Sequence, residues 1–453
     1  MGGRRRNTDT AAVEASSGLV YDLANSGLDL ETKSRALLGL KADFDVLFCG
    51  RGKTAYEFAF AERLRVRIAV PAGMDGGEES EDVDVDEIGY ICTCAVFRGR
   101  ADVACQHIFW LLDQLRRQFV SASPPSKILL SSDGHAQGYT RIERLLSNPA
   151  TTVTLEDLAE RLNWLYLRSA GEEGGMSRTQ RVRDILSAFS TDVLPEEFRV
   201  DLVESEDETG HILPERLRTP EQCVVQGDFE ATAFRLAVHD DNVFTSLCKA
   251  MPPGACAAIY FDKMLERSRK ALSKFDQHCQ TLGKPDEDGD KDKALSLADV
   301  LETLQANTLN IHKNIHTRTP NGLQGAAKAL TTLLEDISTR DKDALARNRY
   351  GRVSFADENE DSRNLYHQLI GKADDNAVEH FILDALADLS GEDLYPFRER
   401  LQAVLHRVEV NRAPKGFILK LGGIVRVAEM GLTRKRAARA GEGEAERGRK
   451  RVR

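Results

Sequence analysis

The chain has 453 residues, of which 41% are hydrophobic and 30% are charged. This length allows two or three domains, and the balance excludes a wholly disordered protein. The net charge of −10 is unevenly divided: residues 434–453 hold nine Lys and Arg and three Glu, a local +6, which leaves −16 on the rest. So acidic a body repels phosphate, which excludes broad nucleic-acid binding by the whole surface.

The sequence carries no signal for a membrane or for secretion. No window approaches 18 consecutive apolar residues, and the basic start lacks the apolar core of a secretory signal. Eight cysteines are too few for a disulfide scaffold in so long a chain. We therefore expect an intracellular protein with reduced cysteines and no membrane partner.

The N-terminal third alternates between helical and strand patterns. Residues 1–28 are small and polar, which is typical of a disordered end. A short helix is then predicted from Leu28, because Leu30, Leu37 and Leu38 recur at helical spacing. Residues 44–70 follow a period of two, which predicts strands.

Turn and loop signals divide these strands. GRGK at 50–53 predicts a hairpin turn; it fails as a phosphate-binding loop because Leu47 stands where that motif needs Gly. Residues 75–87 hold eight acidic and no basic side chains, which indicates a solvated insertion. After strand-like residues 88–94, the stretch 105–120 is predicted to be helical, because its apolar residues fall on one face: Ile108, Leu111, Leu112, Leu115 and Phe119.

Beyond a linker at 121–150, the pattern becomes helical. We expect an all-helical domain over 151–430 and a disordered basic tail over 431–453. Helix starts are indicated by Thr154 with Asp157, by Ser177 with Gln180, and by Pro220. The clearest amphipathic runs are 155–167, 259–275, 297–315, 323–337, 378–389, 397–408 and 417–427. The predicted class is α+β: a small strand-plus-helix module over 29–120, followed by the larger helical domain.

One cluster of residues has the composition of a metal site. Cys92-x-Cys94 and Cys105-x-His107 form two close pairs, joined by a loop long enough to bring them together. Thiolate sulfur and imidazole nitrogen suit Zn²⁺, which prefers four tetrahedral ligands. Four protein ligands leave no open position, so the predicted cofactor is one structural zinc ion. Three buried cysteines and a core histidine are the alternative.

This pattern resembles the SWIM zinc finger. The order Cys-x-Cys, spacer, Cys-x-His, with a preceding strand that ends in YICTC and a helix that begins CQHIFWLL, carries the resemblance. It covers residues 92–107, and with the flanking strands 44–120. SWIM fingers occur in transposases, in ubiquitin-ligase and helicase-associated proteins, and in accessory proteins that bind recombinase paralogues. In the last group a small residue stands where this chain has Trp110.

The resemblance implies a zinc-binding scaffold that contacts a protein or a nucleic acid. The alternatives are a substrate-recruiting subunit of a ubiquitin ligase and an accessory factor in DNA recombination or repair. We expect a non-catalytic protein, because the sequence shows no nucleophile elbow, kinase signature or Cys/His nucleophile setting.

Further residues are candidates for contacts. Arg63, Arg65 and Arg67 share a strand face and, with Arg98 and Arg100, could bind phosphate, or could form a solvated face. Trp110 lies partly off the apolar stripe of its helix and is a candidate partner contact, or it widens the core.

The basic end of the chain is a candidate nuclear-import signal or a nucleic-acid tail, with a solubilising end as the alternative. Its clusters include Arg434, Lys435, Arg436, Arg449, Lys450 and Arg451. We therefore expect nuclear residence, and DNA binding that is weak and depends on this tail. His312 and His316 are four residues apart on a helix that lacks the Glu of an HExxH site, so a surface or core role is expected.

Overall fold

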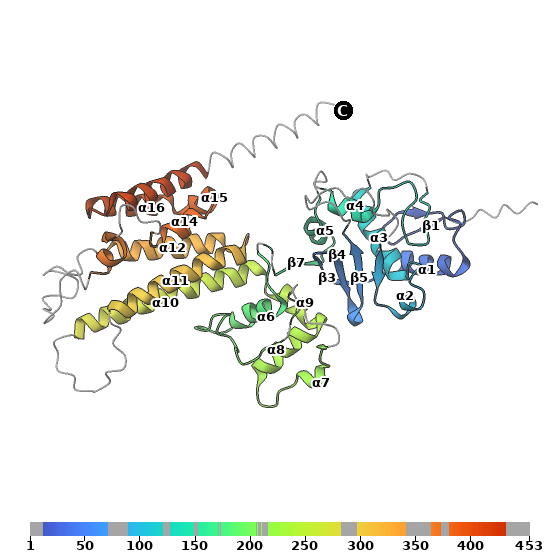
Figure 1. Ribbon diagram of the computed structural model, residues 1–453, viewed down its shortest axis with the longest axis horizontal. Helices are drawn as coiled ribbons and strands as arrows, with labels where there is room; N and C mark the ends of the chain where they lie inside the picture. Colours follow the sequence, from blue (N-terminus) through green and yellow to red (C-terminus); the bar gives the residue numbers. More distant parts are fainter. Residues whose placement is uncertain are drawn as a thin grey trace, which may run out of the picture. The chain divides into compact units, whose positions relative to one another are not determined.

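The computed structural model describes residues 12–70, 89–120, 127–148, 153–170, 172, 174–204, 206, 210, 216–281, 297–340, 364–372 and 380–431. The chain forms two compact units (Figure 1). Unit 1 comprises Met1–Val182 and Asp201–Ala250, and unit 2 comprises Arg183–Val200 and Met251–Arg453. Sheet and helices are both present and helices predominate, so the predicted α+β class holds at this level. None of the helices in the described ranges is long and apolar enough to span a bilayer.

Unit 1 is built around a five-stranded sheet in the order β6-β5-β4-β3-β7. Its neighbours pair antiparallel except β3 and β7, which are parallel. The turn between β3 and β4 at Gly52–Thr54 confirms the predicted hairpin. The strands are β3 (Val46–Arg51), β4 (Ala55–Phe60), β5 (Arg65–Ala69), β6 (Tyr90–Cys92) and β7 (Leu165–Leu167).

The short strand β7 lies in a run that we expected to be entirely helical, 155–167. Helix α5 (Leu155–Arg161) begins at the predicted capping box, where Thr154 and Asp157 satisfy each other's backbone N–H groups. The helix ends before Asn163, which adopts a φ of 57° and redirects the chain. The next three residues then pair with β3. The apolar residues of this run therefore belong first to a helix and then to a strand.

Helices α1 (Leu30–Lys41) and α3 (Gln106–Phe119) pack against each other in unit 1. Asp29 caps α1 by accepting from the Thr32 N–H. The buried face of α1 is not the leucine stripe, because Leu30, Leu37 and Leu38 are exposed. Instead it contains Thr32, Ala36, Gly39 and Leu40. A Cβ on Gly39 would lie 2.4 Å from the Gln106 carbonyl oxygen, so this close packing needs glycine.

Two segments that we expected to lie outside the folded module belong to its core. Residues 12–28, expected to be disordered, form β1 (Val13–Glu14) and β2 (Val20–Tyr21), and Tyr21 is fully buried. The expected linker contributes buried Ile128 and Ile142, the latter in α4 (Ile142–Ser147). Both segments fold because their few apolar side chains join the same hydrophobic cluster as α3.

Three further helices belong to unit 1 although they come later in the chain: α7 (Pro220–Cys223), α8 (Phe229–His239) and α9 (Asp241–Ala250). Pro220 occupies the first turn of α7, as the sequence predicts, and Thr219 and Gln222 form a capping box that was not predicted. Helix α6 (Arg178–Ser187), which Ser177 and Gln180 cap reciprocally, runs from unit 1 into unit 2.

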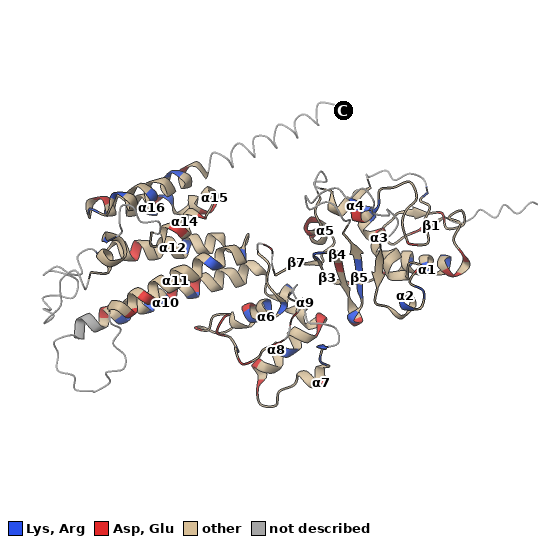
Figure 2. Ribbon diagram, in the orientation of Figure 1, with Lys and Arg blue, Asp and Glu red and all other residues tan. Residues whose placement is uncertain are grey.

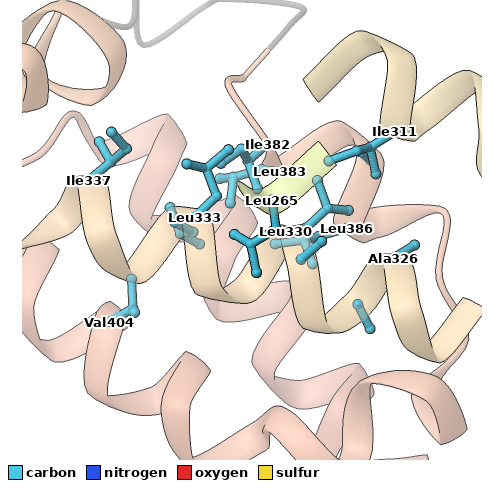
Figure 3. Packing of buried hydrophobic residues seen from close by; sticks show 14 of the residues in the cluster. Leu265, Ile311, Ala326, Leu330, Leu333, Ile337, Ile382, Leu383, Leu386 and Val404 are labelled. Atoms are coloured by element: carbon cyan, nitrogen blue, oxygen red, sulfur yellow. The ribbon is translucent and has the colours of Figure 1, made fainter. Parts of the chain in front are cut away.

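Unit 2 is a helical assembly with one extended hydrophobic cluster (Figure 3). Its long helices are α10 (Pro253–Thr281), α11 (Leu297–Arg318) and α12 (Leu323–Ser338), which match the predicted runs. Shorter helices follow: α14 (Leu383–Ala387), α15 (Gly391–Leu394), α16 (Arg398–Val410) and a helix over 415–431. Buried leucines and isoleucines on α11, α12 and α14 face one another within the cluster.

Candidate metal centre

The side chains of Cys92, Cys94, Cys105 and His107 converge in unit 1. Their ligand atoms all lie within 4.8 Å of one another, and all four residues are buried. The His107 Nδ1 atom lies 3.8 Å from the Sγ atoms of both Cys92 and Cys105. A tetrahedral zinc ion holds its sulfur and nitrogen ligands about 3.5 Å apart, given bond lengths of about 2.3 and about 2.0 Å. The cluster can therefore hold a metal ion, and its donor set is consistent with zinc.

Three elements place the cysteines. Cys92 ends β6, whose pairing with β5 fixes Cys92 opposite Val66. Cys94 caps the short helix α2 (Ala95–Gly99) and accepts from the Phe97 N–H. Cys105 is the N-cap residue of α3. Helix α2 occupies the first half of the spacer that the sequence predicts as a loop.

Backbone N–H groups and helix ends favour the thiolate form that binds metals. The Cys94 N–H donates to the Cys92 Sγ atom over 3.5 Å. A hydrogen bond from the Cys92 thiol, together with His107 and the Ile108 N–H, lowers the pKa of Cys105 to about 4 despite burial. The same hydrogen bond to Cys105, followed by burial, raises the pKa of the Cys92 thiol. Cys105 is thus the first of the three thiols to ionise.

Aromatic side chains hold the histidine ring in place. The imidazole centroid of His107 lies 4.7 Å from the Phe44 ring and 6.0 Å from the Phe60 ring. His107 itself is in the first turn of α3, which packs on α1. A ring held by packing on a rigid helix keeps Nδ1 directed at the sulfur atoms without further rearrangement. The four side chains therefore form a preorganised and closed set.

The cysteines of the described segments form no disulfides, so the three sulfur atoms of this cluster are available as ligands. A second group with metal-binding side chains lies in unit 2 and consists of His312, His316 and Asp388. From the sequence alone we did not expect His312 and His316 to bind a metal, because the Glu of an HExxH motif is missing between them. The third member comes from another helix, far along the chain, and no local spacing could indicate it.

Trp110 lies in the core of unit 1. It is 3% exposed, and its ring is edge-on to Phe44 and Phe60, with centroids 5.6 and 5.7 Å away. Trp164, from the segment between α5 and β7, lies 6.3 Å away. Trp110 is therefore a core residue, as the alternative interpretation of the sequence stated, and it is not available for contact with an outside partner. The sequence did not predict the burial of Trp110, because its packing partners come from three separate segments of the chain.

The candidate phosphate-binding arginines are largely engaged with protein groups. Arg65 pairs with Glu57 and with Asp241, and Arg67 pairs with the same Glu57 on the adjacent strand. Figure 2 colours the basic residues blue and the acidic residues red along the ribbon. Arg63 donates to the Arg218 carbonyl oxygen. Arg63 also lies outside β5, in the short 3-10 helix Ala61–Arg63, so it does not share the strand face that the sequence predicts. Because carboxylates pair with Arg65 and Arg67, the β5 face carries less positive charge than the sequence suggests.

The remaining two arginines belong to α2 and its C-terminal end. Arg98 is exposed, whereas Arg100 pairs with Asp29, Glu31 and Asp102. The acidic insertion 75–87 and the basic clusters from Arg434 to Arg436 and from Arg449 to Arg451 lie outside the described residues.

Comparisons with family models, with curated proteins and with solved structures give no match.

Proposed function

We propose that this chain is a zinc-binding, non-catalytic interaction protein whose unit 1 is a SWIM-type zinc finger with additional elements. The observation that carries the proposal is the buried cluster of three cysteines and one histidine. Four protein ligands saturate a tetrahedral zinc ion, so such an ion has no position for substrate or water. Zinc in this role stabilises a surface and does not perform chemistry.

The order and placement of the ligands support the SWIM assignment. The Cys-x-Cys pair stands at the end of β6, and the Cys-x-His pair stands at the start of α3. A strand end and a helix start joined by one metal ion are the arrangement that the resemblance implies. Here α3 of the finger packs on α1, and β6 belongs to a five-stranded sheet, so the rest of unit 1 supports the finger.

The partner we propose first is a protein, bound in the nucleus. The acidic body disfavours nucleic acid, and the engaged arginines of β5 reduce the strand face as a phosphate site. The basic residues at 434–453 support nuclear import. Recruitment of substrates to a ubiquitin ligase and assistance to DNA recombination or repair are the competing assignments.

Co-purification from native cells, followed by reconstitution with the purified partner, tests this proposal. We expect chromatin proteins to co-purify, whereas recombination proteins would select the recombination assignment. Cys94→Ser should lose the reconstituted complex, and Cys256→Ser should keep it. Cys256 is a matched control because it is a buried cysteine of unit 2 and is not one of the four candidate ligands. Recovery of ubiquitin-transfer enzymes instead would select the ligase assignment. A complex that survives Cys94→Ser would contradict a zinc-dependent interface.

A further inference from the structure

Two histidines and one aspartate meet at the surface of unit 2. The Nε2 atom of His312 lies 2.6 Å from the Oδ2 atom of Asp388, and the Nε2 atom of His316 lies 3.4 Å from the same oxygen. The two imidazole centroids are 6.1 Å apart. All three side chains reach solvent, with exposed fractions of 32% for His312, 58% for His316 and 41% for Asp388. This group shares no residue with the cysteine cluster.

The core of unit 2 holds the three side chains in position. His312 and His316 are one turn apart on α11, so they project from the same face. Asp388 is the C-cap residue of α14, which packs against α11. The neighbouring residues Ile311 on α11 and Leu386 on α14 are fully buried in the shared hydrophobic cluster (Figure 3). The backbones that carry the cluster are therefore fixed by packing.

The electrostatic setting favours a cation between these groups. A carboxylate at the C-terminal end of a helix faces the negative end of the helix dipole, so Asp388 gains from a positive partner. Imidazole nitrogen and carboxylate oxygen are ligands of zinc and related divalent ions. With bonds of about 2.0 to 2.1 Å, tetrahedral ligands lie about 3.3 Å apart. The observed separations of 2.6 and 3.4 Å lie on either side of this value.

We propose that His312, His316 and Asp388 form a second metal site, which binds a divalent transition-metal ion of the zinc class. It differs from the cysteine cluster in two ways. It has no sulfur ligand, and its three ligands belong to exposed or half-buried side chains, which leaves at least one coordination position for water or for a ligand from outside. The ion also links α11 to α14, so it stabilises unit 2.

The competing explanation is a simple ion pair between a protonated His312 and Asp388. In that case His316 is a neighbour without a role, and no metal binds. The two explanations differ in how much His316 matters. An ion pair needs only one histidine, whereas a metal site of three ligands loses most of its affinity when either histidine is removed.

Zinc titration of the full, tag-free chain decides between them. Mild chelation strips an exposed three-ligand site and leaves the buried closed one loaded, after which calorimetry measures the zinc that rebinds. We expect one equivalent to rebind, and the affinity to fall at least tenfold in His316→Ala and in Asp388→Asn. His406→Ala is the matched control, because His406 is an exposed histidine on another helix of unit 2, and it should bind as the wild type does.

Cobalt as a probe separates the two sites. Co²⁺ on cysteine sulfur gives intense charge-transfer absorption, whereas Co²⁺ on nitrogen and oxygen ligands gives only weak bands. We expect Co²⁺ added to the stripped chain to give the weak bands first, and His316→Ala to remove them. Absence of zinc rebinding, or equal binding by His316→Ala and His406→Ala, would overturn the proposal. Because no ligand is shared, either result leaves the function proposed for unit 1 in place.

Discussion

Arg65 on β5 and Asp241 at the start of α9 form an ion pair, with 2.6 Å between Nη2 and Oδ2, although 176 residues separate them in the sequence. Asp241 also accepts from Arg178 at 2.5 Å. All three side chains are largely buried, and the guanidinium groups stack over the rings of Phe48 and Phe244. One carboxylate thus pairs with two buried guanidinium groups inside unit 1, and Glu57 supplies a second negative partner for Arg65.

Replacing this carboxylate should destabilise unit 1 strongly. Asp241→Ala leaves Arg178 buried without its charge partner, and we expect a loss of about 3–5 kcal/mol in the free energy of unfolding. Urea denaturation followed by tryptophan fluorescence reports on unit 1 alone, because both tryptophans, Trp110 and Trp164, belong to it. Arg67→Ala is the control: its pair with Glu57 is exposed, and its loss should cost under about 1 kcal/mol. Equal effects would contradict a structural role for Asp241.

Zinc removal should unfold unit 1 and spare unit 2. Structural zinc contributes about 10–16 kcal/mol in isolated fingers, which is comparable to the whole stability of a domain. We expect elemental analysis to find zinc in the wild type and in Cys256→Ser, and to find less by one ion in Cys94→Ser and in His107→Ala. Hydrogen exchange after chelation should rise in the peptides of β3–β6 and α3 but not in α12. A folded, zinc-free unit 1 would refute the assignment.

Trp110→Ala tests whether this residue serves the core. Loss of a buried indole between Phe44, Phe60 and Trp164 should destabilise unit 1 by about 3–5 kcal/mol. Zinc should also be retained less well against a chelator, because Phe44 and Phe60 contact His107 as well. Fluorescence of the remaining Trp164 follows the unfolding. Unchanged stability together with a lost partner would restore the interface interpretation.

Stability should depend on pH through Asp113. This carboxyl accepts from the Tyr21 and Ser17 hydroxyls, and burial raises its pKa to about 6, above the value of 3.8 that applies when it is unfolded. Between these values the folded chain holds a proton that the unfolded chain has lost, so stability falls as the pH rises from 4 to 6. The shift corresponds to about 3 kcal/mol.

The effect of Asp113 is obtained by comparing the Asp113→Asn variant with the wild type, because protonation of the zinc ligands in acid lowers the stability of both. Asp113→Asn keeps an acceptor oxygen but cannot ionise, so its stability should vary less steeply over this range than that of the wild type. Asp102→Asn, at an exposed site, should follow the wild type. Urea midpoints at a series of pH values make the comparison, and parallel curves for Asp113→Asn and the wild type would contradict the prediction.

DNA binding, where it occurs, should depend on the basic tail. Deleting residues 434–453 should remove most of the affinity for duplex DNA and flatten its salt dependence, since each lost phosphate contact lowers the slope by about 0.9. Fluorescence anisotropy at several salt concentrations measures both effects. If the deletion changes neither, the arginines of β5 and α2 become the candidates, and Arg98→Ala is the variant to compare because Arg98 is exposed.

The sequence predicted those features that are set by neighbouring residues. The ligand pairs, the capping boxes at Thr154 and Ser177 and the hairpin at Gly52 all depend on spacings of a few residues, and the structure has each of them. Contacts between segments that are far apart in the sequence could not be predicted. Nothing near Trp110 indicates that Trp164 will cover it, and nothing near His312 indicates Asp388.

The helix α1 shows a different limit. Its leucines mark a helix but not the buried face, because close contact with α3 selects small residues such as Ala36 and Gly39. Apolar periodicity assumes that large side chains occupy the contact, and helices that approach closely break this assumption. Residues 12–28 were missed because their apolar side chains follow no regular period, although five of them are buried in the core of unit 1: Ala15, Leu19, Tyr21, Leu23 and Leu28.

The course of the chain limits how the protein can be dissected. It leaves unit 1 after Val182, returns at Asp201 and leaves again after Ala250, so three covalent connections join the two units. A fragment that ends at residue 120 would keep all four zinc ligands but would lack β7 and Asp241, and a single proteolytic cut at one connection would leave the units tethered by the other two. A recombinant unit 1 therefore has to be assembled from two discontinuous segments, with a designed peptide in place of residues 183–200.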